Sequence, residues 1–484
     1  MRRPGQGPDW AAVSVVLVVL VGLAGCGGHA STPTTSPSDG RGRPSFVVII
    51  VDDMAYGLFG PGKRLPFVNL PNLEALSTRA AFFERAMVTT SLCSPSRATL
   101  LSGLYAHTHG VPGNESTDIS PDIETYPQIL RASGYETAYV GKWHMNASTD
   151  MPRPGFDYWL SFRGQGVYVD PVLNENGKSF KRTGYITDLL TEYAVSWIRR
   201  PHAKPFVLIL GHKAPHEPAE PAPRHAGAFA DVSLPEPASF EDPYEDKPAW
   251  QRRYARCGGG PTAFVRCPDP QPASLPPWPW PPHDEGRLDY LRSLLAVDES
   301  VGQVMGALAS QDLTRSTYVV FLSDNGLFLG EHRLGDKRLA YEESLRVPLV
   351  VAGPDVSVRR LATMALNLDL APTILDLAGV TVPGAMQGKS LARLLRGESY
   401  ALRDSFLYEY DTEAPFPVVP DIRAVRTQTR KYVTYPALPG EDELYDLATD
   451  PTETVNLAHR LDWAATRAEM RQQLDRLLTE TRAQ

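Results

Sequence analysis

Phe46-Val47-Val48-Ile49-Ile50-Val51-Asp52-Asp53 is an unbroken apolar run that ends in two carboxylates. Every apolar residue after the phenylalanine is β-branched, which indicates a parallel strand buried on both faces. Three further runs have the same character, and a polar side chain follows each within two positions: Thr137–Val140, Phe206–Leu210 and Thr317–Leu322. We therefore expect a parallel sheet whose strands end in polar clusters.

Segments with apolar residues at helical spacing lie between these strands, at Ile123–Ala132, Thr187–Arg199 and Arg287–Ala309. Alternating strands and helices predict an α/β fold with a doubly wound, mostly parallel sheet flanked by helices. In such sheets, ligands bind in the crevice outside the carboxyl ends of the strands. The polar clusters are therefore expected to meet at one site.

Shorter strand-like pieces begin near Asp404, at Ser405–Tyr410 and Lys431–Tyr435, and a charged helical tail follows them. They predict a small C-terminal antiparallel α+β subdomain over residues 401–484, after a catalytic domain over residues 45–400. The proline-rich segment Pro268–Pro282 cannot form a helix or a central strand, so it predicts a surface loop. Its Trp278 and Trp280 either pin the loop to the body, which is the favoured reading, or stack on a sugar.

An apolar run from Ala11 to Gly25 follows two arginines near the N-terminus. As a helix it would be only about 22 Å long, shorter than a bilayer core, so residues 1–26 are expected to be a signal peptide. The run ends in Leu23-Ala24-Gly25-Cys26, which resembles the lipobox of bacterial lipoproteins; an ordinary cleaved signal is the alternative. Residues 27–44 have the composition of a disordered tether. We expect export and a lipid anchor on Cys26, facing outside the cytoplasm.

The 484-residue chain has the 42% hydrophobic and 21% charged residues of an ordinary globular protein. Its formal charge of −8 argues against nucleic-acid binding, which needs clustered lysine and arginine. It has four cysteines. In an exported chain, the nearby Cys257 and Cys267 are expected to form a disulfide, which leaves Cys93 for chemistry.

Cys93-Ser94-Pro95-Ser96-Arg97 is either a buried cysteine before a helix or a catalytic motif. It resembles the C-x-P-x-R signature of type I sulfatases, in the alkaline phosphatase superfamily. The resemblance continues through Gly330-Glu331-His332, Asp336-Lys337-Arg338 and the block from Tyr341 to Leu349, and it covers most of Ser45–Asn456. It implies that a maturation enzyme oxidises Cys93 to formylglycine, whose hydrate attacks sulfur.

The acidic pairs after two of the strands offer only oxygen ligands. Three crowded carboxylates repel one another unless a divalent cation neutralises them, and oxygen ligands favour calcium, with magnesium as the alternative. The absence of an adjoining histidine makes zinc a poor fit. The resemblance implies that the metal ligands are Asp52, Asp53, Asp324 and Asn325, completed by the modified Cys93.

A sulfate monoester is an anion, so its pocket needs fixed cations beside the metal. The resemblance implies that Arg97 and His144 orient the modified residue, that Lys142 lies beside them, and that His216 and Lys337 hold the sulfate oxygens. It leaves open which residue protonates the departing alcohol. His212 and His332 receive no role.

These patterns predict a sulfatase that acts on a sulfated carbohydrate or an aryl sulfate. One alternative is a phosphonate monoester or phosphodiester hydrolase of the same superfamily. Those enzymes often have Asp-His where this chain has Asp324-Asn325. The other is a surface lipoprotein that binds sulfated glycans without catalysis.

Overall fold

The computed structural model describes residues 42–115, 117–256 and 285–482. The predicted signal peptide, the lipid site at Cys26 and most of the tether lie outside these residues. So do Cys257, Cys267 and the two tryptophans of the proline-rich segment. The expectations for these parts of the chain therefore stay predictions.

A mostly parallel sheet organises the described residues, and the expected strands form its centre. Five parallel strands lie side by side in the order β8 (Thr317–Ser323), β1 (Ser45–Val51), β7 (Phe206–Gly211), β3 (Glu136–Lys142) and β4 (Tyr158–Phe162). Ile50 is opposite Gly211 and Val51 is opposite Ser323. The carboxyl ends of these strands are therefore level.

Strands that the sequence analysis did not identify extend this sheet on both sides. Beyond β8, β12 (Leu349–Ala352) runs antiparallel and pairs with β2 (Ala81–Met87), which also pairs with β11 (Arg346–Val347) and β13 (Arg359–Leu366). Beyond β4, the antiparallel strands β5 (Val172–Glu175) and β6 (Lys178–Lys181) form the other edge.

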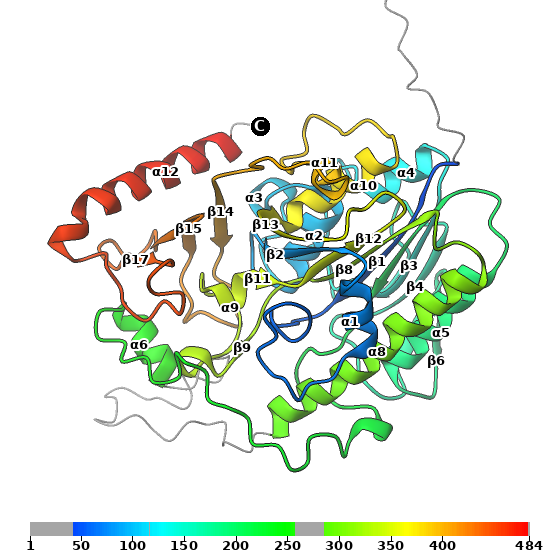
Figure 1. Ribbon diagram of the computed structural model, residues 1–484, viewed down its shortest axis with the longest axis horizontal. Coiled ribbons are helices and arrows are strands. Elements are labelled where there is room, and N and C mark those ends of the chain that lie inside the picture. The colour runs from blue at the N-terminus through cyan, green and yellow to red at the C-terminus, as the bar shows by residue number, and fades with distance from the viewer. Residues whose placement is uncertain (1–41, 116, 257–284, 483–484) are drawn as a thin grey trace, which may run out of the picture. The chain divides into compact units, whose positions relative to one another are not determined.

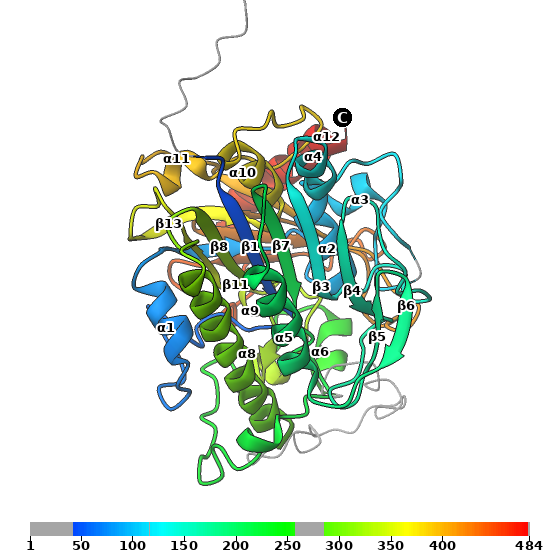
Figure 2. The same cartoon turned by 90° about the vertical axis from the view of Figure 1, so that its right-hand side faces the viewer.

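Helices cover both faces of the sheet, as Figure 2 shows for α5 and α8 on one face and α2 behind it. Alternate residues of β1 enter two apolar clusters: Val47, Ile49 and Val51 in one, and Phe46, Val48 and Ile50 in the other. The first cluster lies under α1 (Pro71–Ser77), α5 (Ile186–Arg199) and α8 (Glu285–Ser310), and the second under α2 (Cys93–Ser102), α4 (Tyr126–Ala132), α10 (Leu370–Leu377) and α11 (Ala392–Leu395). The predicted doubly wound fold is confirmed.

One helix begins later than its apolar spacing indicated. Helix α4 starts at Tyr126 rather than at Ile123. The side chain of Gln128 accepts a hydrogen bond of 2.8 Å from the backbone N–H of Thr125, and Pro127 lies in the first turn. Both features are helix-start signals, so local capping sets this boundary.

A separate antiparallel sheet follows in the chain, as predicted (Figure 1). Its strands are β14 (Ser405–Tyr410), β15 (Ile422–Thr427), β16 (Arg430–Thr434) and β17 (Glu443–Asp446), and α12 (Ala464–Arg482) packs on it. The remaining elements are α3 (Ala106–His109), α6 (Ala249–Arg256), β9 (Phe328–Leu329), β10 (Gly335–Asp336) and α9 (Glu342–Leu345). Residues from Gly42 onward form one compact unit, so the boundary at residue 400 stays a prediction.

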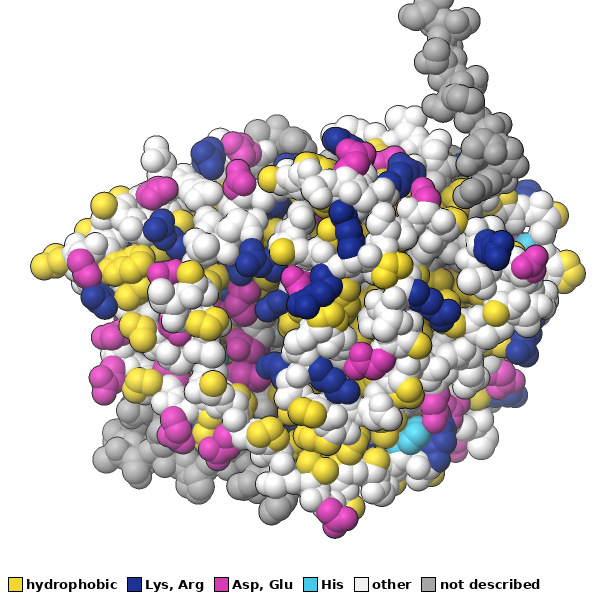
Figure 3. Space-filling model, in the orientation of Figure 1, with side chains coloured by type: hydrophobic (Ala, Val, Ile, Leu, Met, Phe, Trp, Pro, Cys, Tyr) yellow, Lys and Arg dark blue, Asp and Glu magenta, His cyan; other side chains and the backbone are white. Residues whose placement is uncertain are grey.

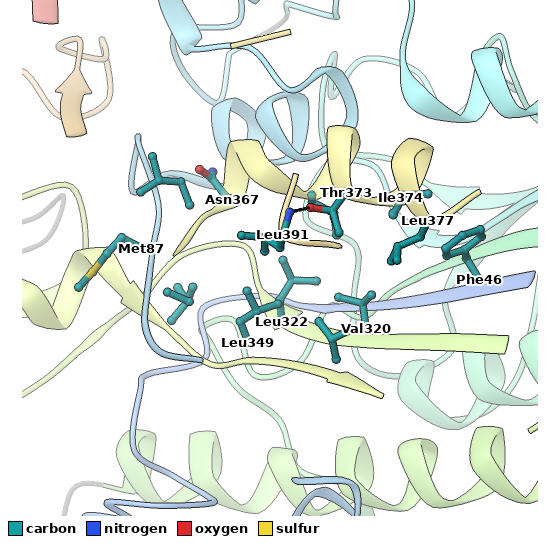
Figure 4. Close-up of a pocket in the computed structure, with 15 residues that line it drawn as sticks. Phe46, Met87, Val320, Leu322, Leu349, Asn367, Thr373, Ile374, Leu377 and Leu391 are labelled. Atoms are coloured by element: carbon teal, nitrogen blue, oxygen red, sulfur yellow. Dashed lines mark hydrogen bonds between the residues drawn. The ribbon is translucent and has the colours of Figure 1, made fainter. Parts of the chain in front are cut away.

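An apolar cavity of about 20 Å³ lies between α10 and the sheet (Figure 4). That volume would hold about one water, which needs two or more polar partners, whereas this lining is almost entirely apolar. We interpret it as a packing gap rather than a ligand site. Among the described residues, no helix combines the length and the apolar character needed to cross a bilayer.

Candidate active site

The predicted site residues come together at the carboxyl edge of the central strands. Asp52 and Asp53 follow β1, Lys142 ends β3, the loop to His216 follows β7, and Asp324 follows β8. Cys93 is the first residue of α2, so the positive end of the helix dipole lies beside its side chain. Ligand atoms of Asp52, Asp53, Cys93 and His216 all lie within 4.8 Å of one another.

The oxygen ligands form a buried cluster whose geometry fits a cation. The backbone N–H of Asp53 donates to Asp324 Oδ1 (3.1 Å), and Asn325 Nδ2 donates to Asp53 Oδ1 (2.6 Å). In the described part of the chain, neither Asp52 Oδ1 nor Asn325 Oδ1 has a hydrogen-bond donor. A buried acceptor without a donor is costly, so these oxygens are suited to hold a divalent ion.

Backbone conformation at the cluster is unusual in two places. Asp53 and His144 both have a φ of 69°, a left-handed conformation that costs free energy for residues other than glycine. Gly326 also has a special role, because a Cβ there would lie 2.1 Å from the backbone oxygen of Glu343. The Asp-Asn-Gly turn can thus pack against α9 only with glycine.

Two lysines beside Cys93 neutralise the carboxylates of Asp52 and Asp53. Lys142 forms an ion pair with Asp52 and donates to Gln165, and both lysine and aspartate are fully buried. Lys337 Nζ donates to Asp53 Oδ2 (2.6 Å) and lies 3.3 Å from the sulfur of Cys93. The residue at position 93 is therefore in direct contact with a fixed positive charge.

Arg97 contacts the ligand cluster rather than the Cys93 side chain. Its Nε donates to Asp324 Oδ2 (2.8 Å), its Nη1 donates to the Lys142 carbonyl (2.6 Å), and its Nη2 lies 3.9 Å from Asp52 Oδ1. One guanidinium thus joins the ends of β8, β3 and β1 to the helix that carries Cys93. The predicted role in orienting residue 93 stays a prediction.

The two histidines contact different residues of the site. His144 Nδ1 is 3.3 Å from Ser94 Oγ, next to Cys93. His216 Nε2 is 3.7 Å from Asp53 Oδ2, and its carbonyl accepts a hydrogen bond from the Tyr168 hydroxyl (2.7 Å). Burial lowers the pKa of His216 to about 3, so its ring is neutral in the ligand-free protein.

The electrostatics of the cluster depend on burial and charge together. Burial raises the pKa of Asp52, but the charges of Lys142 and Arg97 hold it well below its usual range. Burial and the charge of Asp52 raise the pKa of Asp324 to about 7. A bound cation would favour the ionised form of all three aspartates.

Burial also raises the pKa of the Cys93 thiol, to about 12. The nucleophilic form of cysteine is the thiolate, and at neutral pH this side chain would be almost entirely protonated. As an unmodified cysteine, residue 93 is therefore poorly suited to attack a substrate.

The structure adds two residues that the sequence analysis missed. Gln165 follows β4, whose carboxyl end lies at the same edge, and contacts Lys142. Lys213 lies between two histidines that the sequence analysis considered and is 3% exposed. The polar residues after each strand of the edge were the available signal. By contrast, His212 hydrogen-bonds Ser300 (3.0 Å) and His332 hydrogen-bonds Asp242 (2.6 Å), away from the cluster.

Comparison with known proteins agrees with this geometry. Residues 44–380 match the family described as Sulfatase, and residues 330–480 match the family described as N-sulphoglucosamine sulphohydrolase, C-terminal. The chain is 30% identical to the N-acetylglucosamine-6-O-sulfatase of Bacteroides thetaiotaomicron, over 91% of this chain and 87% of that protein.

Solved structures support the same assignment. A protein solved in complex with its substrate D-glucosamine-2-N,6-O-disulfate superposes with a TM-score of 0.80 and 29% identity, over 91% of this chain and 98% of that one. A phosphonate monoester hydrolase of Agrobacterium radiobacter gives 0.73 at 22% identity, over 91% and 96%, and at that identity the likeness concerns the fold alone. The comparisons thus favour a sulfatase over a phosphonate hydrolase. From its family matches, its relatives and the fold that carries this cluster, the chain belongs to the sulfatase family.

Proposed function

We propose that this sulfatase removes a 6-O-sulfate group from an N-acetylglucosamine or glucosamine residue. The observation that carries the proposal is the position of Cys93, buried at the start of α2 between Lys337 and the oxygen cluster. The names of the relative and of the solved complex support the sugar part of the proposal.

The chain's own residues would act on an anionic ester. Lys337 and Lys142 lie where they can hold sulfate oxygens, and charge that moves onto the leaving oxygen is stabilised by such fixed donors. His216 and Lys337 are the two candidates to protonate the departing alcohol. Formylglycine at position 93 would supply a hydrated aldehyde, whose hydroxyls can attack sulfur and later release sulfate by re-forming the carbonyl.

A substrate panel tests this proposal. We expect the highest kcat/KM with N-acetylglucosamine 6-sulfate, and lower values with N-sulfated glucosamine, a 2-O-sulfated uronate, an aryl sulfate and a phosphonate monoester. A preference for the phosphonate would favour the superfamily alternative. Retention of sulfated sugars without sulfate release would favour the non-catalytic binder.

We further propose that calcium occupies the oxygen cluster, held by Asp52, Asp53, Asp324 and Asn325. A divalent ion there would neutralise the carboxylates and polarise a sulfate oxygen. These four ligands all donate oxygen, which favours calcium or magnesium, whereas the neighbouring His216 nitrogen and Cys93 sulfur are the kinds of donor that zinc prefers.

Ion binding is expected to stabilise the fold. At an ion concentration of 100 times Kd, the stabilisation is about 2.7 kcal/mol, so chelation should lower Tm and calcium should restore it better than magnesium. Asp324→Asn should remove this response, while the exposed Asp475→Asn on α12 should keep it. An unchanged Tm with and without chelator in the parent protein would contradict the assignment.

Lys213 is expected to bind the anionic substrate. Its ammonium lies 4.6 Å above the Tyr168 ring, and among the described residues no carboxylate forms an ion pair with it, unlike Lys142 and Lys337. An unpaired buried ammonium is costly, so this lysine is suited to form an ion pair with the sulfate group of a substrate bound at the catalytic cluster. Lys213→Met should raise KM more than it lowers kcat, and the exposed Lys204→Met should change neither. A fall in kcat as large as the rise in KM would argue for a merely structural role.

The cellular location is proposed from sequence alone. The apolar run before Cys26 and the lipobox-like residues support an exported lipoprotein. Cys26→Ala should then move the protein from the membrane fraction to the soluble fraction. The same environment would allow the proposed disulfide between Cys257 and Cys267, which peptide mapping without reductant would detect.

A further inference from the structure

A second hollow, of about 810 Å³, lies away from the catalytic cluster. Its walls come from the edge strands β2, β11 and β13 of the central sheet, from the loop between β1 and α1, and from β15 of the C-terminal sheet. None of the predicted catalytic or metal residues lines it. Figure 3 shows this hollow, with basic side chains along one edge and acidic ones in the facing wall.

Three arginines from three adjacent strands lie at one edge of the hollow, and of the three only Arg360 pairs with the Glu84 carboxylate in the described part of the chain. Arg360 Nε donates to Glu84 Oε1 (2.6 Å), and Arg346 Nε donates to the Glu84 backbone oxygen (2.7 Å). Arg85 donates to the neutral side chain of Gln428 (2.6 Å). This edge therefore has a local excess of positive charge.

The whole lining is more basic than the rest of the protein. Six arginines and five glutamates line the hollow, so its formal charge is +1, whereas the chain carries −8. Burial and the nearby Glu331 raise the pKa of Glu343 to about 8. This carboxyl is therefore mostly protonated at neutral pH, and the lining has one negative charge fewer. The hollow is thus a local exception in an acidic molecule, and it favours an anionic ligand.

The facing wall has polar residues of both kinds. Ser239 and Glu343 line it, but Ser239 Oγ and Glu343 Oε2 are closed off from solvent, and Glu343 Oε2 lies 4.0 Å from His332 Nε2. Arg64 and Glu331, 2.6 Å apart, lie beside them. At the arginine edge, the Arg346 guanidinium stacks 3.8 Å from the centre of the Tyr56 ring, which leaves an ordered planar donor. The arginine edge of the hollow is therefore suited to the sulfate or carboxylate groups of a ligand.

We propose that this hollow is a second glycan-binding site, which takes a sulfated oligosaccharide. The proposal rests on the proposed function in one respect: the ligand is a remote part of the same class of sulfated carbohydrate. Guanidinium groups bind sulfate-like anions through paired N–H donors. The volume lies in the range of sites that enclose molecules of drug size, far larger than a single inorganic anion requires. Binding there would hold an enzyme close to its polymer between turnovers.

The test uses a Cys93→Ala protein, which binds without turnover, and a heparin-derived hexasaccharide of defined size. Calorimetry should resolve two classes of site. Adding Arg85→Gln and Arg360→Gln should weaken one class by about tenfold per arginine, since a hydrogen bond to a charged group is worth at least a factor of ten. Arg360 is exposed and Arg85 hydrogen-bonds the neutral Gln428, so neither change should unfold the protein.

Three controls decide the result. Arg471→Gln on the exposed face of α12 removes one positive charge elsewhere and should leave both classes of site intact. A chemically desulfated hexasaccharide should lose the arginine-dependent class. In the protein with Cys93 intact, the double arginine variant should keep full kcat on a monosaccharide sulfate.

Equal weakening by Arg471→Gln, or unchanged binding in the double variant, would overturn the second site. These readouts do not depend on turnover, so failure of the proposed enzymatic function would be seen separately, in the substrate panel.

Discussion

Replacing Cys93 with alanine is expected to abolish sulfate release while leaving the fold intact. The side chain is fully buried at the start of α2, where Lys337 is 3.3 Å from its sulfur and the oxygen cluster surrounds it. Alanine is smaller than cysteine, has high helix propensity and adds no charge. The loss should therefore appear in kcat at nearly unchanged thermal stability.

Mass spectrometry of the peptide that contains position 93 shows which chemical form the residue has in active protein. In active protein we expect the aldehyde mass rather than the thiol mass, because burial raises the pKa of the thiol to about 12 and leaves it a weak nucleophile. Cys93→Ser should also be inactive in a host whose maturation enzyme oxidises only cysteine. Full activity from protein that carries only the thiol would refute the formylglycine mechanism.

Removing the ammonium of Lys337 or the imidazole of His216 is expected to cost about 10²- to 10³-fold in kcat, the usual loss for one charge-stabilising donor. Lys337 contacts both Asp53 and Cys93, and His216 lies 3.7 Å from the same aspartate. Lys204→Ala, at an exposed position, should show no loss. Full activity in either site variant would remove that residue from the mechanism.

Leaving-group dependence separates the two candidates for the general acid. A sugar alkoxide needs a proton as it departs, whereas 4-nitrophenolate is stable without one. The variant that lacks the acid should therefore lose much more activity with N-acetylglucosamine 6-sulfate than with 4-nitrophenyl sulfate. The other variant should lose similar activity with both, because it holds the sulfate group that the two substrates share. Similar losses with both substrates in both variants would argue against either residue as the acid.

Much of the fold was predictable because it depends on short-range patterns. The apolar runs that became β1, β3, β7 and β8 are buried on both faces, and such strands read as continuous hydrophobic segments. Once these four are parallel neighbours, their carboxyl ends must share an edge. That inference brought Asp52, Lys142, His216 and Asp324 together from positions far apart in the chain.

Edge strands were not predictable in the same way. Strands β2 and β13 interrupt their apolar residues with Glu84, Arg85 and Arg360, since one side of this edge faces the second hollow. Their hydrophobic pattern is too weak to recognise before the pairing is known. The hollow itself is formed by many segments spread from Tyr56 to Thr452, so no local motif predicts it.

By itself, the sequence determined which elements form, where their polar ends lie and which chemical groups meet at the catalytic edge, because periodicity and strand direction are local properties of the chain. Only the tertiary structure decided which charge faces which. It paired Lys142 with Asp52, joined Arg97 to Asp324 and brought Arg346 and Arg360 to Glu84. These pairings depend on distances between side chains that are remote in sequence, and packing sets those distances.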